Sequence, residues 1–250
     1  MSLRLAVRTL TAEYDAPGGG TLAALGPVTF GVEPGTFVCL VGPSGCGKST
    51  LIRILAGLQR PTRGEAFVDS APITSPPRGV GVMFQEANLM PWRTVLDNIA
   101  LPLELAGAAK AERYGAADRL LPMLGLEGFA QAYPGELSGG MAQRTALGRL
   151  LIQQPEALLL DEPFGALDAL TREQLSADLL NIWARYRQTV LMVTHDIHDA
   201  VWLADRVLVM SRRPGRLIAD IPVPLERPRD SYSAAFGETA RQVREAINRA

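Results

Sequence analysis

The fold of this chain can be predicted from residues 37–50, which read Phe37-Val38-Cys39-Leu40-Val41-Gly42-Pro43-Ser44-Gly45-Cys46-Gly47-Lys48-Ser49-Thr50. Residues 37–41 are apolar, as in a buried strand, and residues 42–50 fit the pattern G-x-x-x-x-G-K-[ST] of a phosphate-binding loop. Glycines let such a loop curl so that successive backbone N–H groups face an anion. We expect a helix over residues 49–58, whose N-terminal dipole adds to phosphate binding. A glycine turn that contains a lysine by chance is the alternative, but the strand before it and the helix after it argue against this.

The loop gives a chemical task to its polar residues. Lys48 is expected to reach the β- and γ-phosphates of a nucleoside triphosphate, and the Ser49 hydroxyl to ligate Mg²⁺. The predicted nucleotide-binding residues of the loop are Gly42, Pro43, Ser44, Gly45, Cys46, Gly47, Lys48, Ser49 and Thr50.

Two carboxylates follow a second apolar run, Ala157–Leu160. Asp161 is expected to hold the Mg²⁺ that Ser49 also touches. Glu162 is expected to point away from Asp161, because neighbouring side chains of an extended segment face opposite ways, and to polarise a water for attack on the γ-phosphate. A strand that merely meets an acidic loop is the alternative. The absence of an Asn-Lys-x-Asp motif and of an obvious lid makes GTPases and kinases weaker candidates.

The order of apolar runs and helical patterns predicts an α/β fold with a largely parallel sheet. Strands are expected over 37–41, 80–84, 158–160, 190–193 and 207–210, and antiparallel strands over 3–32 around a Gly18–Gly20 turn. A helical subdomain is expected over about 88–154, with its helices interrupted at Pro102, Gly115, Pro122 and Pro134. We expect one domain over 1–225 and a tail over 226–250 that ends in a helix near 239–248.

Composition excludes several classes of protein. The chain carries 25 Lys and Arg against 26 Asp and Glu, so nucleic acid is not expected as a partner. Two cysteines fit a reducing compartment. The sequence has no signal-peptide core and no apolar run of about 20 residues. If the protein acts at a membrane, we therefore expect it to bind there through a partner protein.

Leu137-Ser138-Gly139-Gly140-Met141 adds a second helix N-terminus that could bind an anion. With these motifs in this order, the chain resembles an ABC transporter ATPase from about Leu3 to Met210. The resemblance implies a RecA-like parallel-sheet core, an N-terminal antiparallel β subdomain, an inserted helical subdomain, and ATP and Mg²⁺ as ligands.

The resemblance also implies roles for single residues. Tyr14 matches an aromatic that stacks on adenine, although a plain strand tyrosine is the alternative. Gln85 matches the glutamine that senses Mg²⁺ and the attacking water, or it is only a polar strand end. His195 matches the histidine that bonds the γ-phosphate, and it joins Glu162 and Lys48 as a catalytic residue. His198 lacks further metal ligands and is interpreted as a solvated helix residue.

In the resembling family, a turn equivalent to Ser138, Gly139 and Gly140 caps the γ-phosphate bound by the opposite subunit. This implies a homodimer that encloses two ATP molecules. Residues 166–168 match a loop that contacts the partner subunit. Met141 departs from the usual glutamine, at a tolerant position of the motif.

The implied system is an importer. Its other parts are transmembrane permease subunits and a periplasmic or extracellular solute-binding protein, with this chain peripheral at the cytoplasmic face of the inner membrane. Leu89, Met90 and Trp92 are expected either to receive a permease helix or to pack within the helical subdomain. Residues 91–95, together with residues 213–216, 221–224 and 227–229, resemble importers of nitrate, taurine, alkanesulfonates and thiamine precursors. A soluble ABC-type ATPase of repair or translation, and a regulator that does not hydrolyse, are the alternatives.

Overall fold

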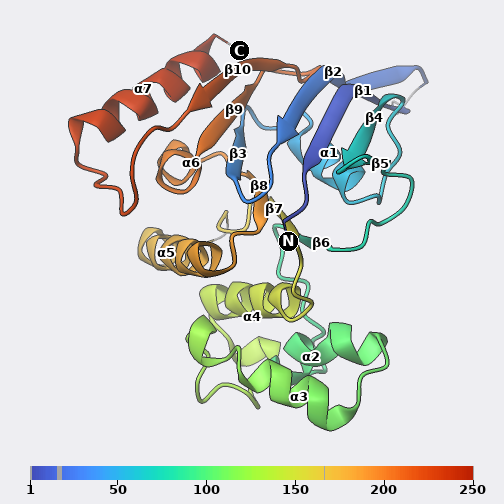
Figure 1. The fold of residues 1–250 in the computed structure, drawn as a ribbon, viewed down its shortest axis with the longest axis vertical. Helices are drawn as coiled ribbons and strands as arrows, with labels where there is room; N and C mark the ends of the chain where they lie inside the picture. Colours follow the sequence, from blue (N-terminus) through green and yellow to red (C-terminus); the bar gives the residue numbers. More distant parts are fainter. Residues whose placement is uncertain (1, 16–18, 166, 250) are drawn as a thin grey trace. The chain divides into compact units, whose positions relative to one another are not determined.

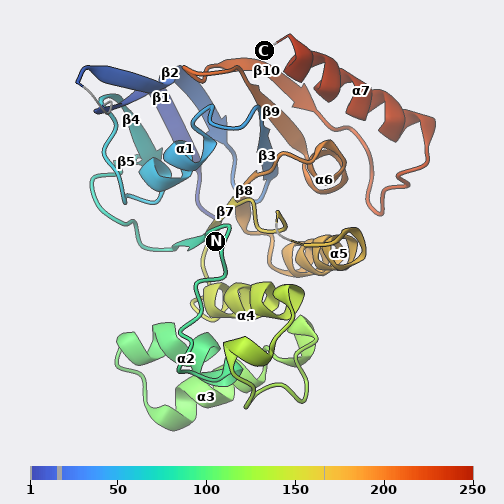
Figure 2. The same cartoon turned by 180° about the vertical axis from the view of Figure 1, so that it is seen from behind.

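The computed structural model describes residues 2–15, 19–165 and 167–249, and the chain divides into two compact units. The first unit comprises Met1–Val80, Glu156–Glu162 and Arg187–Ala250. The second comprises Gly81–Pro155 and Pro163–Tyr186. Figures 1 and 2 show the elements of both units from opposite sides.

A largely parallel sheet forms the core of the first unit. Its strands lie in the order β10-β9-β3-β8-β7, and only β10 runs antiparallel to its neighbour. Every residue of β3, β7 and β8 is buried, which explains their continuous apolar sequences. The strands are β3 (Phe37–Val41), β7 (Ala157–Asp161), β8 (Thr189–Val193), β9 (Arg206–Met210) and β10 (Leu217–Pro222).

The carboxyl ends of three parallel strands lie in register. Val193 of β8 pairs with Leu40 of β3 on one side and with Asp161 of β7 on the other. The strands predicted in this sheet are confirmed to within one residue at each end. Because ligands of open parallel sheets bind at the carboxyl ends of the strands, this edge is where the site is expected.

The first unit also contains a four-stranded antiparallel sheet in the order β2-β1-β4-β5. β1 and β2 pair antiparallel, as predicted for residues 3–32, while Gly18 of the predicted turn lies outside the described residues. The strands are β1 (Leu5–Asp15), β2 (Thr21–Val32), β4 (Arg63–Val68) and β5 (Ala71–Pro72).

Helix α1 (Lys48–Leu55) begins one residue earlier and ends three residues earlier than predicted. It ends early because Gly57 takes a positive φ of 69° and turns the chain. A Cβ atom at residue 57 would lie 2.3 Å from the Ser75 carbonyl oxygen, so only glycine fits this turn.

The chain leaves the first unit at β6 (Val80–Met83), and the second unit is mainly helical. Its helices are α2 (Val95–Leu105), α3 (Lys110–Asp118), α4 (Gly139–Leu151) and α5 (Ala169–Tyr186), with 3-10 turns at Pro122–Leu124 and Pro134–Glu136.

The predicted interruptions at Pro102 and Gly115 are wrong, because both residues lie inside helices. α2 is held by tertiary contacts: Val95 and Ile99 are fully buried. The buried Asn98 amide donates hydrogen bonds to the carbonyls of Met90, Arg93 and Thr94. Such packing outweighs the one backbone hydrogen bond that Pro102 cannot make.

The chain after Arg212 contains more structure than predicted. β10 is a new strand, and its Pro222 stands at the last position of an edge strand, where no N–H is needed. Helix α7 (Ala234–Asn248) begins five residues before the predicted start, at the N-cap Ser233, whose hydroxyl accepts from the Phe236 N–H. Figure 1 shows α7 beside β9, β10 and α6 (Ile197–Leu203).

Among the described residues, no helix combines the length and the apolar character that a bilayer crossing requires.

Candidate nucleotide-binding and hydrolysis site

The phosphate loop joins the end of β3 to the start of α1. Gly45 and Gly47 have φ angles of 74° and 101°, which favour glycine. A Cβ atom at residue 47 would lie 2.5 Å from Leu25 Cδ2 and 2.9 Å from the Ala24 carbonyl oxygen. The two glycines therefore give the loop its curl and its close fit against β2.

Lys48 is held within its own loop. Its side chain is only 6% exposed, and Nζ donates to the Gly42 carbonyl at 2.8 Å and the Pro43 carbonyl at 3.1 Å. Cys46 Sγ, a weak acceptor, lies 3.9 Å away. Since an ammonium group has three donors, a phosphate oxygen can compete for the one that faces sulfur.

Ser49 and Asp161 meet at the edge of the parallel sheet. Ser49 Oγ donates to Asp161 Oδ1 at 3.1 Å, and the aspartate is buried. Burial raises the pKa of Asp161, and the neighbouring Glu162 adds to the effect. The Ser49 hydrogen bond and the cations of Arg53 and Lys48 oppose it.

This pair fits a magnesium ion bound together with a phosphate. Mg²⁺ prefers oxygen ligands and is usually held by one or two carboxylates and the phosphates of a substrate. Among the described residues, no group of three or more His, Cys, Asp and Glu side chains could hold a metal. The Ser49 hydroxyl and the Asp161 carboxylate can supply two oxygen ligands, and the phosphates of a nucleotide in the adjacent loop can supply others. This fits the way in which Mg²⁺ is usually bound.

Glu162 has a backbone that the sequence did not predict. Its φ is 48°, in the left-handed region that a non-glycine residue enters at a cost of about 1–2 kcal/mol. The expectation of an extended segment at Glu162 is therefore wrong. The Glu162 N–H donates to the Val193 carbonyl at 2.9 Å, which ties the residue to the end of β8. Such strain is concentrated at functional sites.

His195 contacts Glu162 directly. Its Nδ1 lies 3.1 Å from Glu162 Oε2, and the His195 side chain is half exposed. The structure thus brings together two residues with separate predicted catalytic roles, Glu162 from its place after a strand and His195 from the resemblance. It places both beside Asp161, at the end of the same group of parallel strands.

Tyr14 lies near the end of the phosphate loop. Its hydroxyl makes a 2.8 Å hydrogen bond with the Thr50 hydroxyl and donates to Gln59 Oε1 at 3.0 Å. The residue is 36% exposed. Its stacking on adenine stays a prediction. The two hydrogen bonds of its hydroxyl hold the ring in place.

The other predicted site residues belong to the second unit. Ser138 is the N-cap of α4, and its Oγ accepts from the Met141 N–H at 3.3 Å. Gly139 and Gly140 form the first turn of this helix. A Cβ atom at residue 140 would lie 2.4 Å from Thr171 Cγ2, so a larger residue would not fit there. The capping of a partner's nucleotide stays a prediction.

Two further predictions also concern the second unit. Gln85 is exposed, and its carbonyl accepts from Gln143 Nε2 at 2.8 Å. Its roles toward ATP and Mg²⁺ stay predictions. In the predicted partner-contact loop, Asp168 accepts from the backbone N–H and the hydroxyl of Thr171, while Ala166 lies outside the described residues.

His198 is exposed and lies on a helix, as predicted, but it is not simply solvated. Its ring stacks on Trp202 of α6 with centroids 5.9 Å apart and lies 5.2 Å from the ring of Phe236 in α7. Sequence spacing could not show this contact, because Phe236 lies far along the chain.

Sequence reasoning missed two supports of the phosphate loop. Arg213 Nε donates to the Gly45 carbonyl at 3.1 Å. Gly215 donates to the Ala24 carbonyl and accepts from the Gly26 N–H. A Cβ atom at residue 215 would lie 1.9 Å from the Cys46 carbonyl oxygen. The Pro214-Gly215 dipeptide signalled a turn, but nothing in the sequence placed that turn against the loop.

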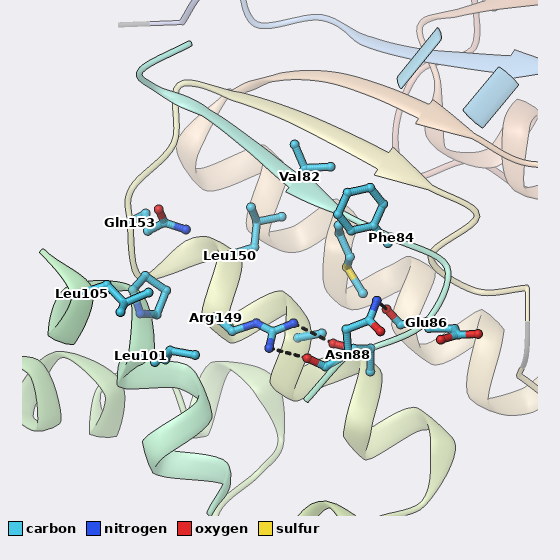
Figure 3. Close-up of a pocket in the computed structure, with 13 residues that line it drawn as sticks. Val82, Phe84, Glu86, Asn88, Leu101, Leu105, Arg149, Leu150 and Gln153 are labelled. Atoms are coloured by element: carbon cyan, nitrogen blue, oxygen red, sulfur yellow. Dashed lines mark hydrogen bonds between the residues drawn. The ribbon is translucent and has the colours of Figure 1, made fainter. Parts of the chain in front are cut away.

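A groove of about 400 Å³ lies within the second unit. Figure 3 shows Leu101 and Leu105 of α2 on one side and Val82 and Phe84 at β6 on another. Arg149 of α4 donates to the carbonyls of Asn88 and Ala87 at 2.8 and 2.6 Å and so fixes the segment after β6.

The predicted docking residues lie outside this groove. Trp92 is 71% exposed, so its ring does not pack within the second unit. Leu89 and Met90 are half-buried, and none of the three residues lines the groove. The apolar Leu101 and Leu105 were missed, because a helical pattern does not show which apolar side chains remain uncovered.

Comparisons with known proteins extend these observations. The family model described as ABC transporter matches residues 25–165. An uncharacterized ABC transporter ATP-binding protein, MJ0412 of Methanocaldococcus jannaschii, is 46% identical over 97% of this chain and 91% of its own. The aliphatic sulfonates import ATP-binding protein SsuB of Bacillus cereus is 43% identical over 92% of this chain and 91% of its own.

Further matches include another importer subunit and a solved structure. The nitrate import ATP-binding protein NrtD of Synechocystis is 46% identical over 82% of this chain and 77% of its own. The ATP-binding cassette MJ0796, a dimer in a post-hydrolysis state bound to ADP and phosphate, superposes with a TM-score of 0.78 at 32% identity. That match covers 88% of this chain and 98% of the cassette.

The fold and the site define a phosphate-loop nucleotide hydrolase, with its loop and its acidic pair at one edge of a parallel sheet. Within that class, the chain belongs to the ABC transporter family. It is an ABC ATPase and an ATP-binding subunit.

Proposed function

We propose that this chain hydrolyses ATP in a dimer and thereby drives the import of a small oxyanion through separate permease subunits. The observation that carries the proposal is the contact of Glu162 with His195 beside the Ser49–Asp161 pair. This arrangement supports Glu162 as a general base, His195 as the group that orients it, and Ser49 and Asp161 as oxygen ligands of a metal.

Each residue has a task in hydrolysis. Lys48 and the backbone N–H groups of residues 44–50 bind the phosphates, and Ser49 and Asp161 would hold Mg²⁺. A magnesium ion held there would neutralise charge on the phosphate oxygens. Glu162 accepts a hydrogen bond from the attacking water and aligns it.

His195 holds this arrangement together. In its doubly protonated form, His195 donates from Nδ1 to Glu162 Oε2, which fixes the orientation of the carboxylate, and can donate from Nε2 to a γ-phosphate oxygen. Loss of His195 would therefore impair the alignment of the water more than the binding of ATP.

The second unit supplies the dimer contact. The first-turn N–H groups of α4 and the Ser138 hydroxyl would cap a γ-phosphate bound by the partner, since a helix N-terminus attracts anions. Dimeric structures of the similar cassette MJ0796 support this arrangement. Hydrolysis would separate the phosphates that bridge the two chains, and the dimer would open.

The groove of the second unit would receive a helix of a permease subunit. Leu105 is 80% exposed at its margin, which offers apolar surface to an amphipathic helix. Bound in this way, the chain would lie at the cytoplasmic face of the membrane. The importer relatives for sulfonates and nitrate support oxyanions as the class of cargo, delivered by a solute-binding protein.

A complementation experiment tests the proposal. Cells that lack this chain are expected to lose growth on nitrate as sole nitrogen source or on alkanesulfonates as sole sulfur source. The wild-type chain should restore growth and Glu162→Gln should not. Leu105→Glu should keep the ATPase rate of the purified chain but fail to restore growth. The matched control Ile218→Glu, at an exposed apolar residue of β10, should restore growth.

Growth of the deletion strain on both sources, with normal uptake, would contradict the choice of cargo. Normal growth with Leu105→Glu would move the docking surface away from the groove. ATP turnover by purified Glu162→Gln at the wild-type rate would remove Glu162 as the base.

A further inference from the structure

Helix α6 links the hydrolysis site to the tail of the chain. It begins two residues after His195, and the Asp196 carboxylate caps its N-terminus by accepting from the N–H groups of His198 and Asp199. The helix has only seven residues. Because such short helices are not stable alone, the position of α6 depends on what packs against it.

Two arginines of the tail bind the C-terminus of α6. The final carbonyls of a helix have no partner within it. Arg229 Nη1 donates to the carbonyls of Val201 and Trp202 at 2.6 and 2.9 Å. Arg227 Nη2 donates to the next carbonyl, that of Leu203. Three successive carbonyls are thus satisfied by the tail.

Arg229 is a buried cation. It is 5% exposed, and its Nε donates to the Leu225 carbonyl, so three carbonyl oxygens surround the guanidinium. Burial lowers the pKa of Arg229 to about 10, which leaves it charged at neutral pH. A cation here also complements the negative end of the helix dipole.

The tail holds α6 at further points. Arg227 Nη1 forms an ion pair with Asp205 Oδ1, and Asp205 Oδ2 accepts from the N–H of Phe37, the first residue of β3. The ring of Phe236 in α7 lies against His198, in the first turn of α6. In Figures 1 and 2, α7 lies beside α6 from both sides.

We infer that the tail is part of the hydrolysis site's support, and that Arg229 is a positioning residue which keeps α6, and through it His195, within reach of Glu162. This inference rests on the proposed role of His195 in hydrolysis. The reason is geometric: α6 continues directly from His195, and a displacement of about 1 Å can lower a rate by 100-fold. The phosphate loop makes none of these contacts with Arg229, so the binding of ATP should be spared.

The test compares three variants of the full chain. Arg229→Met removes the donors and the charge, Arg229→Lys keeps the charge, and Arg241→Met removes an exposed arginine that pairs within α7. For Arg229→Met we expect kcat to fall about tenfold or more, with the KM for ATP changed less than twofold. Arg229→Lys should recover part of kcat. The control Arg241→Met should match the wild type.

A spectroscopic signal separates positioning from loss of fold. The chain has two histidines, so the Hε1 resonance of His195 can be assigned as the one that is absent from the spectrum of His195→Ala. We expect that resonance to shift in Arg229→Met and to stay in place in Arg241→Met. If Arg229→Met does not fold, Arg229→Lys decides, through a lowered kcat with unchanged ATP affinity.

Two failures are distinguishable. Wild-type turnover by His195→Ala would overturn the proposed role of His195 itself. Lost turnover in His195→Ala, together with unchanged kcat and an unshifted His195 resonance in the Arg229 variant that folds, would overturn the inference alone.

Discussion

At the scale of single residues, Asp161 shows a conflict between stability and function. Its carboxylate is buried, and burial raises its pKa. Above that pKa the ionised side chain therefore destabilises the folded state, and the destabilisation is relieved as the pH falls through it. The same ionised form is the one that can ligate Mg²⁺.

We therefore predict that Asp161→Asn unfolds at a higher urea concentration than the wild type at neutral pH, because it removes a buried charge and keeps an acceptor for Ser49. Its Mg²⁺-dependent turnover should fall by roughly 100-fold or more. In the wild type, Mg²⁺ affinity should decline as the pH falls. Because the pKa of Asp161 is raised, this decline should begin at a higher pH than it would for an aspartate with an ordinary pKa. Equal stability of the two proteins, with an Mg²⁺ affinity independent of pH down to the ordinary aspartate range, would refute this account.

Single residues also show how far sequence reasoning reaches into the site. The loop, Asp161, Glu162 and His195 follow from motif and order, because each lies at or just after the carboxyl end of a predicted strand. The left-handed backbone of Glu162 and its contact with His195 do not follow, since both depend on the pairing of β7 with β8. The contact of Gly215 with the phosphate loop could not be predicted either, because the two segments lie far apart in the sequence.

At the scale of elements, buried strands are the most predictable and helix limits the least. β3, β7 and β8 are buried on both faces, so their sequences are almost continuously apolar. Such an apolar run can be recognised in the sequence without knowing which elements pack against the strand. α2 passes through Pro102 because its buried face decides its length. β10 was missed because its half-buried alternation contains a proline and depends on β9 as a partner.

The turn before β10 makes a testable contribution to the phosphate loop. Gly215→Ala would push the Cys46 carbonyl, and we predict that ATP affinity falls about tenfold because the loop N–H groups lose their alignment. The matched control is Gly237→Ala on α7, where a Cβ atom meets nothing within 4 Å. This control should bind ATP normally and gain up to about 1 kcal/mol in stability. Equal ATP affinity in the two variants, measured by fluorescence titration, would show that the turn does not support the loop.

At the scale of the whole molecule, the proposed mechanism divides its parts between the two units. The phosphate loop, Asp161, Glu162 and His195 belong to the first unit, and the Ser138 turn and the groove belong to the second. A turn that caps the partner's nucleotide would make each ATP site a joint product of two chains. The sequence predicted the motifs of both units, because each motif is contiguous in the chain.

The most direct measurement is the mass of Glu162→Gln in solution, by light scattering, with ATP and Mg²⁺. We expect a stable dimer with ATP and a monomer with ADP. We also expect a monomer with ATP when Ser138→Phe is added, because the bulky ring blocks the capping turn. A Glu162→Gln chain that binds ATP yet stays monomeric at high concentration, or a dimer that Ser138→Phe does not affect, would rule out the shared nucleotide site.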